Sequence, residues 1–501
     1  MSEPSRQLEP TNYDRAQLYQ LGAIQPFGFL IVASSDWKIM RASINLEEFL
    51  GISYKDALGQ PLSAIIMPQT LHAIRNRLSV MRGPGIVERL FCIAFADGGP
   101  AFDVALHLSD GQIIIEGEPS QDGRQGGSTI SIRAIMARLD QAQTPEEFLR
   151  EAARQARGIT GFDRVLVCRF DDTGSGEVVA EAARPAIGSF LGFHFPASDF
   201  PAEARALHTR NIFRVIADVE TAPVPIVPEV DEHGRTTDLS LAILRSVSPV
   251  HAEYLKNIGV VASLWLPIMV NGNLWGLLAC HHYTARLPSF ERRSAAELFG
   301  QMFASRLESR ERQRALELET GARRTVERLL TAVTDNADLL ADAAWLNEAI
   351  ADAVPVDGVA VWINGRVAVR GLTPSQVQFP ALVETLNRTS GQVLATDHLA
   401  EFCPDAAANG DAAGLLAIPI SRSPSDYVIF FRQEILRTVR WAGDPPNTVQ
   451  HASGDPALTP RKRFEAWSEM VRGRSLPFSE AERRIAETIR LTLQAARRLA
   501  G

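Results

Sequence analysis

The chain has 501 residues, which is enough for about three domains with a large buried core. Its 46% apolar and 22% charged residues are typical of a globular protein and exclude a disordered chain. The 51 basic and 59 acidic residues give a formal charge of −8. No basic run contains interleaved aromatic residues, so we predict no nucleic-acid partner. The first four residues are polar and acidic, which predicts no signal peptide.

The four cysteines lie far apart, and none forms a C-x-x-C pair. This spacing argues against a disulfide framework or a zinc site, and it is typical of a protein of the reducing cytoplasm. The cysteines are Cys92, Cys168, Cys280 and Cys403.

The first part of the chain is predicted to be a polar, irregular segment, residues 1–15, followed by an α+β domain, residues 16–130. Short β-branched and aromatic runs between turn residues predict its strands. We place these strands at 27–33, 37–42, 89–96, 101–109 and 112–117.

A second domain is expected over residues 138–310. Thr144, Pro145 and Glu147 predict the start of a helix, because they supply an N-cap, a first-turn proline and a capping box. Two strands are predicted to follow, and a proline-rich, charged stretch is predicted to be a long loop. The strands are placed at 164–170 and 177–183, and the loop at 221–240.

One apolar stretch, residues 261–280, is about as long as a membrane helix. Pro267 interrupts it, and Asn271-Gly272 lies in its middle, where this pair is typical of a hairpin with a type I′ turn. We therefore predict two buried antiparallel strands here, 261–270 and 274–280, and no membrane partner.

A helix too long for a typical globular helix is predicted at 289–334, where there is no proline. We predict that this helix connects the second and third domains. Its apolar stripe is expected to pair with a second copy of the chain, or else to pack against the chain's own domains. The stripe is formed by Leu298, Phe299, Met302, Phe303 and Leu307.

A third domain is expected over residues 335–501, with strands near 358–363 and 415–420 and a further pair flanking a polar insert at 443–460. Ser479 and Glu482 predict a capping box for a final helix. That helix ends with its apolar face open, so we expect a second dimer contact there and a further domain beyond it. The face is formed by Ile485, Ile489, Leu493, Ala496 and Leu499.

Common catalytic and nucleotide-binding motifs are absent: the sequence has no P-loop, G-x-G-x-x-G, H-E-x-x-H or G-x-S-x-G. His281 and His282 are adjacent on a predicted strand, so their side chains point to opposite faces and cannot share a metal. We predict no metal site. The residues alone favour a multi-domain sensory protein over an enzyme.

Five ordered segments make the prediction more specific, because together they resemble the bacteriophytochrome photosensory core of PAS, GAF and PHY domains. The resemblance covers nearly the whole chain. It implies a PHY tongue hairpin at about 433–470 and an open-chain tetrapyrrole, a bilin, in the GAF pocket. The segments are Ile24–Gly28, Pro196–Pro201, Leu241–Tyr254, Leu274–His282 and Pro460–Phe464.

The resemblance also implies roles for pocket residues. Asp199 would contact the pyrrole nitrogens and the tongue residue Arg461, as a bidentate lock. Arg214 and Arg245 would hold the two propionates, a task suited to guanidinium groups. The remaining pocket residues would be His251 beside the pyrroles, Tyr254, and His281 and Ser263 around the far ring and a propionate. Taken alone, these residues would instead suggest a surface ion pair and satisfied core histidines.

Both attachment positions of the family lack a thiol. The family links biliverdin to a cysteine near the N-terminus, and plant and cyanobacterial relatives use instead a cysteine directly before the pocket histidine. These positions are Tyr13 and Val250 in this sequence. A phenol is no comparable nucleophile, because its pKa is near 10 and its oxygen is harder than a thiolate sulfur.

Four pocket positions also depart from the family pattern. Trp265 replaces a residue that is usually small, and it either fills an empty pocket and stabilises it or faces outward. The other three departures are Phe27, Cys168 and His208, and the tongue motif carries Arg463 in place of serine.

Three hypotheses follow. The first is a signalling module that has lost covalent bilin attachment and, with it, light sensing; it would pass a signal to a histidine kinase output and a response regulator beyond this chain. The second is a photoreceptor that binds biliverdin non-covalently. The third is a redox sensor using Cys92, Cys168, Cys280 or Cys403.

Overall fold

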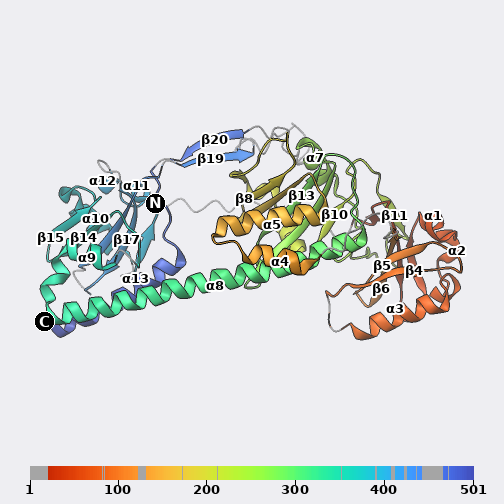
Figure 1. Cartoon of the computed structure of the whole chain (residues 1–501), viewed down its shortest axis with the longest axis horizontal. Helices are drawn as coiled ribbons and strands as arrows, with labels where there is room; N and C mark the ends of the chain where they lie inside the picture. Colours follow the sequence, from red (N-terminus) through yellow and green to blue (C-terminus); the bar gives the residue numbers. More distant parts are fainter. Residues whose placement is uncertain are drawn as a thin grey trace. The chain divides into compact units, whose positions relative to one another are not determined.

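The computed structural model describes residues 21–500 except 82, 84, 122–130, 172, 212, 351–352, 390–391, 408–411, 422–425, 436, 443–465 and 472. The chain forms two compact units, Met1–Leu307 with Arg440–Trp467, and Glu308–Val439 with Ser468–Gly501. Each unit combines largely antiparallel sheets with helices, which confirms the predicted α+β class (Figure 1). No helix in the described part of the chain is both long and apolar enough to cross a bilayer.

The first domain is built on an antiparallel sheet in the order β1-β11-β3-β2-β6-β5-β4. Its core includes Phe29, Phe95 and Phe102, whose rings meet edge to face at 5.3–5.5 Å. The predicted strands are confirmed with ends shifted by at most two residues. The elements are β1 Ala23–Ile24, β2 Phe29–Ala33, β3 Ile39–Ser43, β4 Glu88–Ala94, β5 Ala101–Ser109, β6 Gln112–Pro119, α1 Leu46–Leu50, α2 Tyr54–Ala57, η1 Leu62–Ala64 and α3 Pro68–Val80.

The loop predicted at 221–240 is wrong in part, because Val224–Val227 forms strand β11 between β1 and β3. Proline is disfavoured within strands because it has no N–H group to donate to a neighbouring strand. Here Pro225 uses only its carbonyl, which accepts a hydrogen bond from the Ile44 N–H at 3.1 Å. The strand forms through pairing that is distant in sequence, which local composition does not report.

Gln25 joins the first two domains within the first unit, and it is buried. Its backbone N–H donates to the carbonyl of Leu244 at 2.7 Å, and its side-chain amide donates to the carbonyl of Val215 at 2.9 Å. The same side chain accepts a hydrogen bond from the Ala217 N–H at 3.0 Å. The residue that follows β1 of the first sheet is thereby bonded into the second domain.

The second domain has a sheet in the order β10-β12-β13-β7-β8-β9, continued by β19 and β20. Asn271 and Gly272 have φ of 50° and 77°, as a type I′ turn requires, and the hairpin between β12 and β13 is confirmed. The elements are α4 Ile132–Asp140, α5 Pro145–Thr160, β7 Arg164–Phe170, β8 Gly176–Ala183, β9 Phe193–Phe195, η2 Ala197–Asp199, α6 Ala202–Arg210, β10 Arg214–Ile216, α7 Pro249–Asn257, β12 Ala262–Val270, β13 Asn273–His282, β19 Arg437–Ala442 and β20 Ala466–Val471.

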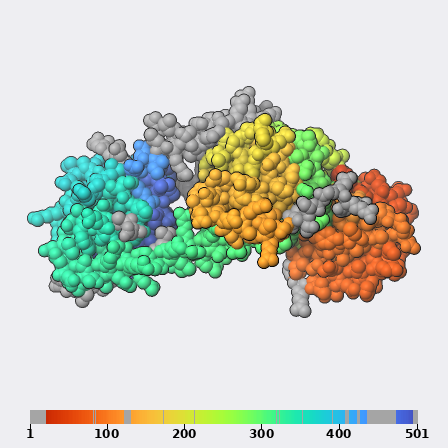
Figure 2. Space-filling model, in the orientation of Figure 1, coloured from red at the N-terminus to blue at the C-terminus, as the bar shows by residue number. Residues whose placement is uncertain are grey.

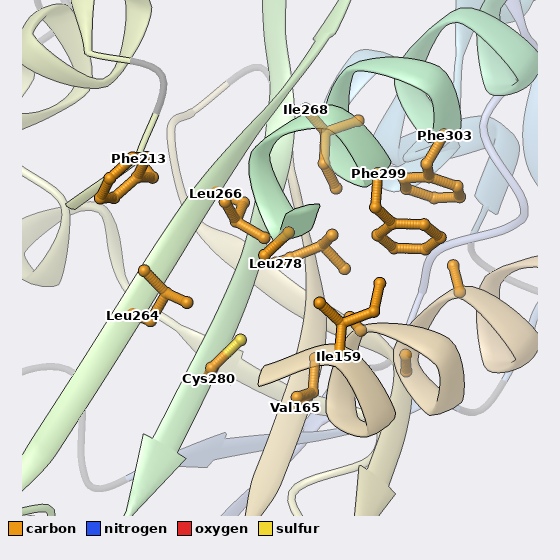
Figure 3. Packing of buried hydrophobic residues seen from close by; sticks show 14 of the residues in the cluster. Ile159, Val165, Phe213, Leu264, Leu266, Ile268, Leu278, Cys280, Phe299 and Phe303 are labelled. Atoms are coloured by element: carbon orange, nitrogen blue, oxygen red, sulfur yellow. The ribbon is translucent and has the colours of Figure 1, made fainter. Parts of the chain in front are cut away.

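One face of this sheet carries the main core of the unit. Leu264, Leu278 and Cys280 project from β12 and β13 toward Ile159 of α5 and Phe299 of α8 (Figure 3). The space-filling view shows the orange surface of α4 and α5 beside the yellow surface of the residues that follow them (Figure 2), and α5 packs against β7 and β8. The opposite face of the sheet carries a smaller apolar cluster on β7, β8 and β13 and, on β10 and β12, the pocket described below.

The predicted helix start and spine are both present. Thr144 and Glu147 form the capping box of α5, and α8 runs without interruption from Phe290 to Asp335 (Figure 1). Some residues of the apolar stripe of α8 are buried and others are exposed. Phe299, Phe303 and Leu307 are buried in the chain's own core, whereas Leu298 is 46% exposed. For these three buried residues, the prediction that they pack against the chain's own domain is confirmed, and the prediction that they form a dimer contact is wrong.

The third domain has an antiparallel sheet in the order β15-β14-β18-β17-β16, and both predicted central strands are confirmed. The elements are η3 Ala337–Ala341, α9 Ala343–Ile350, β14 Gly358–Ile363, β15 Arg366–Gly371, η4 Gln376–Gln378, α10 Phe379–Asn387, β16 Leu394–Thr396, α11 Leu399–Phe402, α12 Pro404–Ala407, β17 Ala412–Pro419, β18 Tyr427–Gln433 and α13 Glu480–Ala500.

The final helix, α13, begins at the predicted capping box of Ser479 and Glu482. The open apolar face predicted for it is wrong over its first turns. Ile485, Ile489 and Leu493 are at most 3% exposed, because they pack on the core side of β17 and β18. The side chains of Ala496 and Leu499 lie outside the described residues.

Candidate functional site: a cationic pocket in the second domain

The pocket lies on the face of β10 and β12 opposite the core, and α6 and α7 also contribute to it. Arg214 is the cross-strand partner of Trp265, and Ile216 is the partner of Ser263. Cross-strand partners point to the same face of a sheet, so the pairing brings these four side chains together. The lining residues are Leu21, Ala204, Leu207, His208, Arg214, Ile216, Arg245, Ser246, Val247, Ser248, His251, Ser263 and Trp265.

Two guanidinium groups line this pocket without a carboxylate partner. Arg245 is 6% exposed, and its Nη1 has no hydrogen-bond partner among the described residues. Arg214 donates from Nη2 to the Ser246 carbonyl at 2.8 Å, but its Nη1 is also buried without a described partner. Burial lowers the pKa of Arg245 to about 10, and burial together with the charge of Arg245 holds the pKa of Arg214 well below its usual value. The pocket is thus built to receive negative charge.

The histidines of the site are neutral at physiological pH. Burial, reinforced by the nearby arginines, lowers the pKa of His208 to about 3 and that of His251 to about 4. His281 has a pKa of about 3, mainly through burial. Each imidazole can therefore accept as well as donate a hydrogen bond.

Trp265 occupies the pocket, so the outward-facing alternative is wrong. It is 7% exposed and stacks on His208, with ring centres 5.1 Å apart, and it meets His251 edge-on at 5.2 Å. Its indole Nε1 has no hydrogen-bond partner in the described part of the chain. The hollow between the lining side chains has a volume of about 560 Å³, which includes space open to solvent.

Of the other expected site residues, Ser263 lines the pocket, whereas Tyr254, Asp199 and His281 lie beside it. The Tyr254 hydroxyl donates to Asp199 at 3.3 Å, and the Tyr254 ring stacks on His251. His281 is buried on β13 opposite Ser263, and its Nδ1 has no described partner. The Ser263 hydroxyl donates to the Cys280 carbonyl at 3.2 Å. Arg461 lies outside the described residues, so its contact with Asp199 stays a prediction.

Of the three other positions where the sequence departs from the family pattern, one lines the pocket and two do not. His208 lines the pocket, whereas Cys168 pairs with Leu277 and Phe27 lies under the guanidinium of Arg293. Val250 lies in the first turn of α7, directly before His251. Tyr13 is outside the described residues.

Three of the four cysteines are buried, and none of the four is disulfide-bonded. Burial raises the pKa of Cys168 and of Cys280 to about 12, so both thiols stay protonated and unreactive. Cys403 is buried in the third domain, and Cys92 on β4 is exposed. The described residues contain no group of three or more His, Cys, Asp or Glu placed to hold a metal ion.

Glu116 is a charged residue near the site that sequence reasoning missed. It comes from β6 of the first domain, is 2% exposed, and accepts hydrogen bonds from the N–H groups of Ile243 at 3.2 Å and Leu244 at 2.7 Å. Burial raises its pKa to about 7, and Arg214 opposes the shift. A single charge after the apolar run Ile113–Ile115 was the available signal.

Comparison with known families explains the order of the domains. Residues 14–120 match the family described as PAS fold, residues 144–310 match the GAF domain, and residues 322–498 match the phytochrome region. These regions, in this order, define a photosensory core. The chain belongs to the phytochrome family.

Solved structures and curated relatives support this assignment. A Stigmatella aurantiaca phytochrome photosensory core module is 34% identical, with a TM-score of 0.82, over 97% of this chain and 98% of that one. A bacteriophytochrome from R. palustris is 35% identical, also at 0.82, over 95% and 96% of the two chains.

Among curated proteins, cyanobacterial phytochrome B of Nostoc sp. is 35% identical over 95% of this chain and 64% of its own length. The Pseudomonas aeruginosa bacteriophytochrome is 34% identical over 96% and 66%. The Xanthomonas campestris bacteriophytochrome is 32% identical over 99% and 80%. The chain thus spans just under two thirds of the first two relatives.

Proposed function

We propose that this chain is the sensory part of a phytochrome-type signalling protein that forms no covalent bilin adduct and does not respond to light. The single observation that carries the proposal is the position of Trp265, whose ring is stacked inside the pocket where the bilin would lie. The indole takes up part of the volume that a tetrapyrrole in this pocket would need.

The attachment chemistry supports the same proposal. The two positions used for attachment in the family carry Tyr13 and Val250. The buried Cys168 and Cys280 cannot replace them, because the high pKa of each thiol removes the nucleophilic thiolate.

The output is proposed from the family and from chain length. The curated relatives extend well beyond the matched region, so we expect a histidine kinase output and a response regulator to follow this sensory part. We also propose a cytoplasmic homodimer formed along α8, where Leu316 and Leu330 are 56% and 40% exposed.

The test is reconstitution with biliverdin. The purified chain is mixed with the pigment, and red absorbance is recorded before and after denaturation. We expect no far-red band in the wild-type chain, and a band in a Trp265→Gly variant, because removing the indole reopens the pocket. A pigment that stays on the denatured wild-type polypeptide would overturn the proposal.

A second function, non-covalent biliverdin binding, is favoured by the unpaired Arg214 and Arg245 in the pocket. It predicts a far-red band in the wild-type chain that disappears on denaturation. The redox alternative now depends chiefly on Cys92, the exposed thiol. Reducing and non-reducing gels of wild type and Cys92→Ser, with mass measurement after oxidant, would test it.

A further inference from the structure

We propose that His107 and Glu116 form a proton-sensitive switch that sets how firmly the segment Ile243–Arg245 is held at the junction of the first two domains. The proposal goes beyond the proposed function, because both residues belong to the first domain and act without any ligand in the pocket. Its basis is a buried imidazole, without a described hydrogen-bond partner, beside a buried carboxyl group that bonds to this segment.

The two side chains lie diagonally across neighbouring strands of the first sheet. His107 is on β5 opposite Ile114, and Glu116 is on β6 opposite Ala105, so both project from the same face. Their exposed fractions are 0% and 2%. The Nδ1 of His107 is 3.7 Å from the Oε1 of Glu116, just beyond hydrogen-bond distance. Neither ring nitrogen has a hydrogen-bond partner among the described residues, so the imidazole is still able to accept a proton.

Glu116 holds the junction through both of its carboxylate oxygens. Oε1 accepts a hydrogen bond from the Ile243 N–H at 3.2 Å, and Oε2 accepts one from the Leu244 N–H at 2.7 Å. The next residue, Arg245, is bridged to Ile24 of β1. Hydrogen bonds to an ionised carboxylate are about twice as strong as those between neutral groups. Protonation of Glu116 would therefore weaken the attachment of this segment to the first domain.

One proton from solvent is enough to change the arrangement. Burial raises the pKa of Glu116 to about 7 and lowers that of His107 to about 4, so the carboxyl group takes up the proton while the imidazole stays neutral. A protonated Oε1 is a donor, and a small side-chain rotation brings it within hydrogen-bond distance of Nδ1 of His107. The Ile243 N–H then loses its acceptor, and the Leu244 N–H keeps a weaker one.

Two cations and two acids act on the pair from the elements packed around it. Both cations oppose protonation of Glu116, and both acids favour the uptake of a proton by the pair. Burial is the largest cause of the raised pKa of Glu116, so it decides the direction of the shift. The cations are Arg214 on β10 and Arg245, and the acids are Asp238 and Glu118, which is on β6 and is itself paired with Arg293 of α8.

The experiment is amide hydrogen exchange of the whole chain between pH 8 and pH 6, with mass spectrometry of the peptide 239–246. Each rate is divided by the intrinsic exchange rate at that pH. We expect the protection of this peptide to fall at least threefold as the pH is lowered, because the junction opens more often. A peptide within α5 should keep its protection. A flat profile for 239–246 in the wild-type chain would overturn the inference.

Glu116→Gln imitates the protonated state, because an amide offers one acceptor and one donor group where a carboxylate offers two acceptors. We expect its protection at pH 8 to be no higher than that of wild type at pH 6, and to be independent of pH. Glu48→Gln, at an exposed glutamate of α1, is the matched control and should titrate like wild type. A pH-dependent loss that persists in Glu116→Gln would assign it to another group and overturn the inference.

His107→Phe tests the sharing of the proton, because the phenyl ring has a similar size but no nitrogen to accept it. The midpoint of the loss of protection is expected to fall by about half a pH unit or more. His72→Gln, at an exposed histidine of α3, is the control and should keep the wild-type midpoint. An unchanged midpoint in His107→Phe would overturn the inference, and this variant decides the matter if Glu116→Gln does not fold.

Discussion

Burial of Arg245 without an ion-pair partner is expected to lower the stability of the folded chain, and it leaves a guanidinium N–H in the pocket able to bind an anion. Its guanidinium is buried, lines the pocket and has no carboxylate partner. Arg432 in the third domain is similarly buried, but it pairs with Glu482 and donates to the carbonyls of Pro355 and Pro477. The two residues have similar exposure and opposite expected effects on stability, because only Arg432 has its donors satisfied.

The first prediction uses this contrast. Arg245→Met is expected to raise the stability of the ligand-free chain, because it removes a buried guanidinium that forms no described ion pair within 4 Å and is only partly compensated by the more distant Asp238 and Glu116. Arg432→Met is expected to lower stability by up to about 3–5 kcal/mol, because it leaves the partly buried Glu482 carboxylate without its guanidinium partner. Calorimetric unfolding in ligand-free buffer checks both. A lower melting temperature for Arg245→Met would contradict the prediction.

The second prediction concerns acid. The pKa of His208 is lowered to about 3 in the folded chain, so the unfolded chain takes up a proton at higher pH. Its contribution to stability is complete above pH ~6.5 and is lost as the pH falls toward 3. His208→Phe, which keeps the stacking on Trp265, should reduce the slope of stability against pH by up to about 1.4 kcal/mol per pH unit in that range.

Unfolding is followed by denaturant titration from pH 4 to pH 7. His72→Gln, at an exposed histidine of the first domain, serves as the control for the loss of an imidazole outside the pocket. Comparing each variant with wild type cancels the opposite contribution of Glu116, whose raised pKa favours the folded chain as the pH falls from about 7. Equal slopes for wild type and His208→Phe would refute the assigned pKa.

The site residues were predictable to the extent that ordered motifs carried them. The resemblance assigned Arg214, Arg245 and His251 to one pocket, and all three line the same pocket in the structure. They did not decide the orientation of Trp265, which depends on the strand pairing that sets its face. Glu116 could not be found by motif, because it comes from another domain and meets the site only through long-range packing.

At the scale of elements, local chemistry explains which predictions succeeded. The capping boxes at Thr144 and Ser479 and the turn at Asn271-Gly272 depend on a few adjacent residues, and all are present. Strand β11 was missed, since its partners lie about 180 residues or more away in sequence. The buried stripe of α13 was read as open because its covering strands, β17 and β18, are distant in the chain.

The third prediction tests the cap of α5. Thr144→Ala is expected to lower stability by about 0.5–2 kcal/mol, because the side-chain oxygen that accepts from the Glu147 N–H is lost. Thr144→Ser keeps that acceptor and should stay within a few tenths of wild type. The two melting temperatures are compared by calorimetry, and equal values for both variants would show that the cap contributes nothing.

At the scale of the whole molecule, α8 carries the fourth prediction. Leu316 and Leu330 are exposed and two heptads apart, so they lie on one side of the helix and suit a coiled-coil contact with a second copy. Leu316→Glu with Leu330→Glu should convert a dimer into a monomer in sedimentation velocity. Leu108→Glu, at an exposed leucine on β5, should keep the dimer. A double variant that still sediments as a dimer would exclude this contact.

The junction at Gln25 has a mechanical consequence. Ala23–Gln25 is bonded on one side to β11 and on the other to the segment that ends at Arg245 and Ser246. A relative movement of the first two domains would therefore act on both rows of hydrogen bonds. Because the same short segment bonds to both neighbours, a displacement of the backbone at Arg245 would be transmitted through β1 to the edge of the neighbouring sheet.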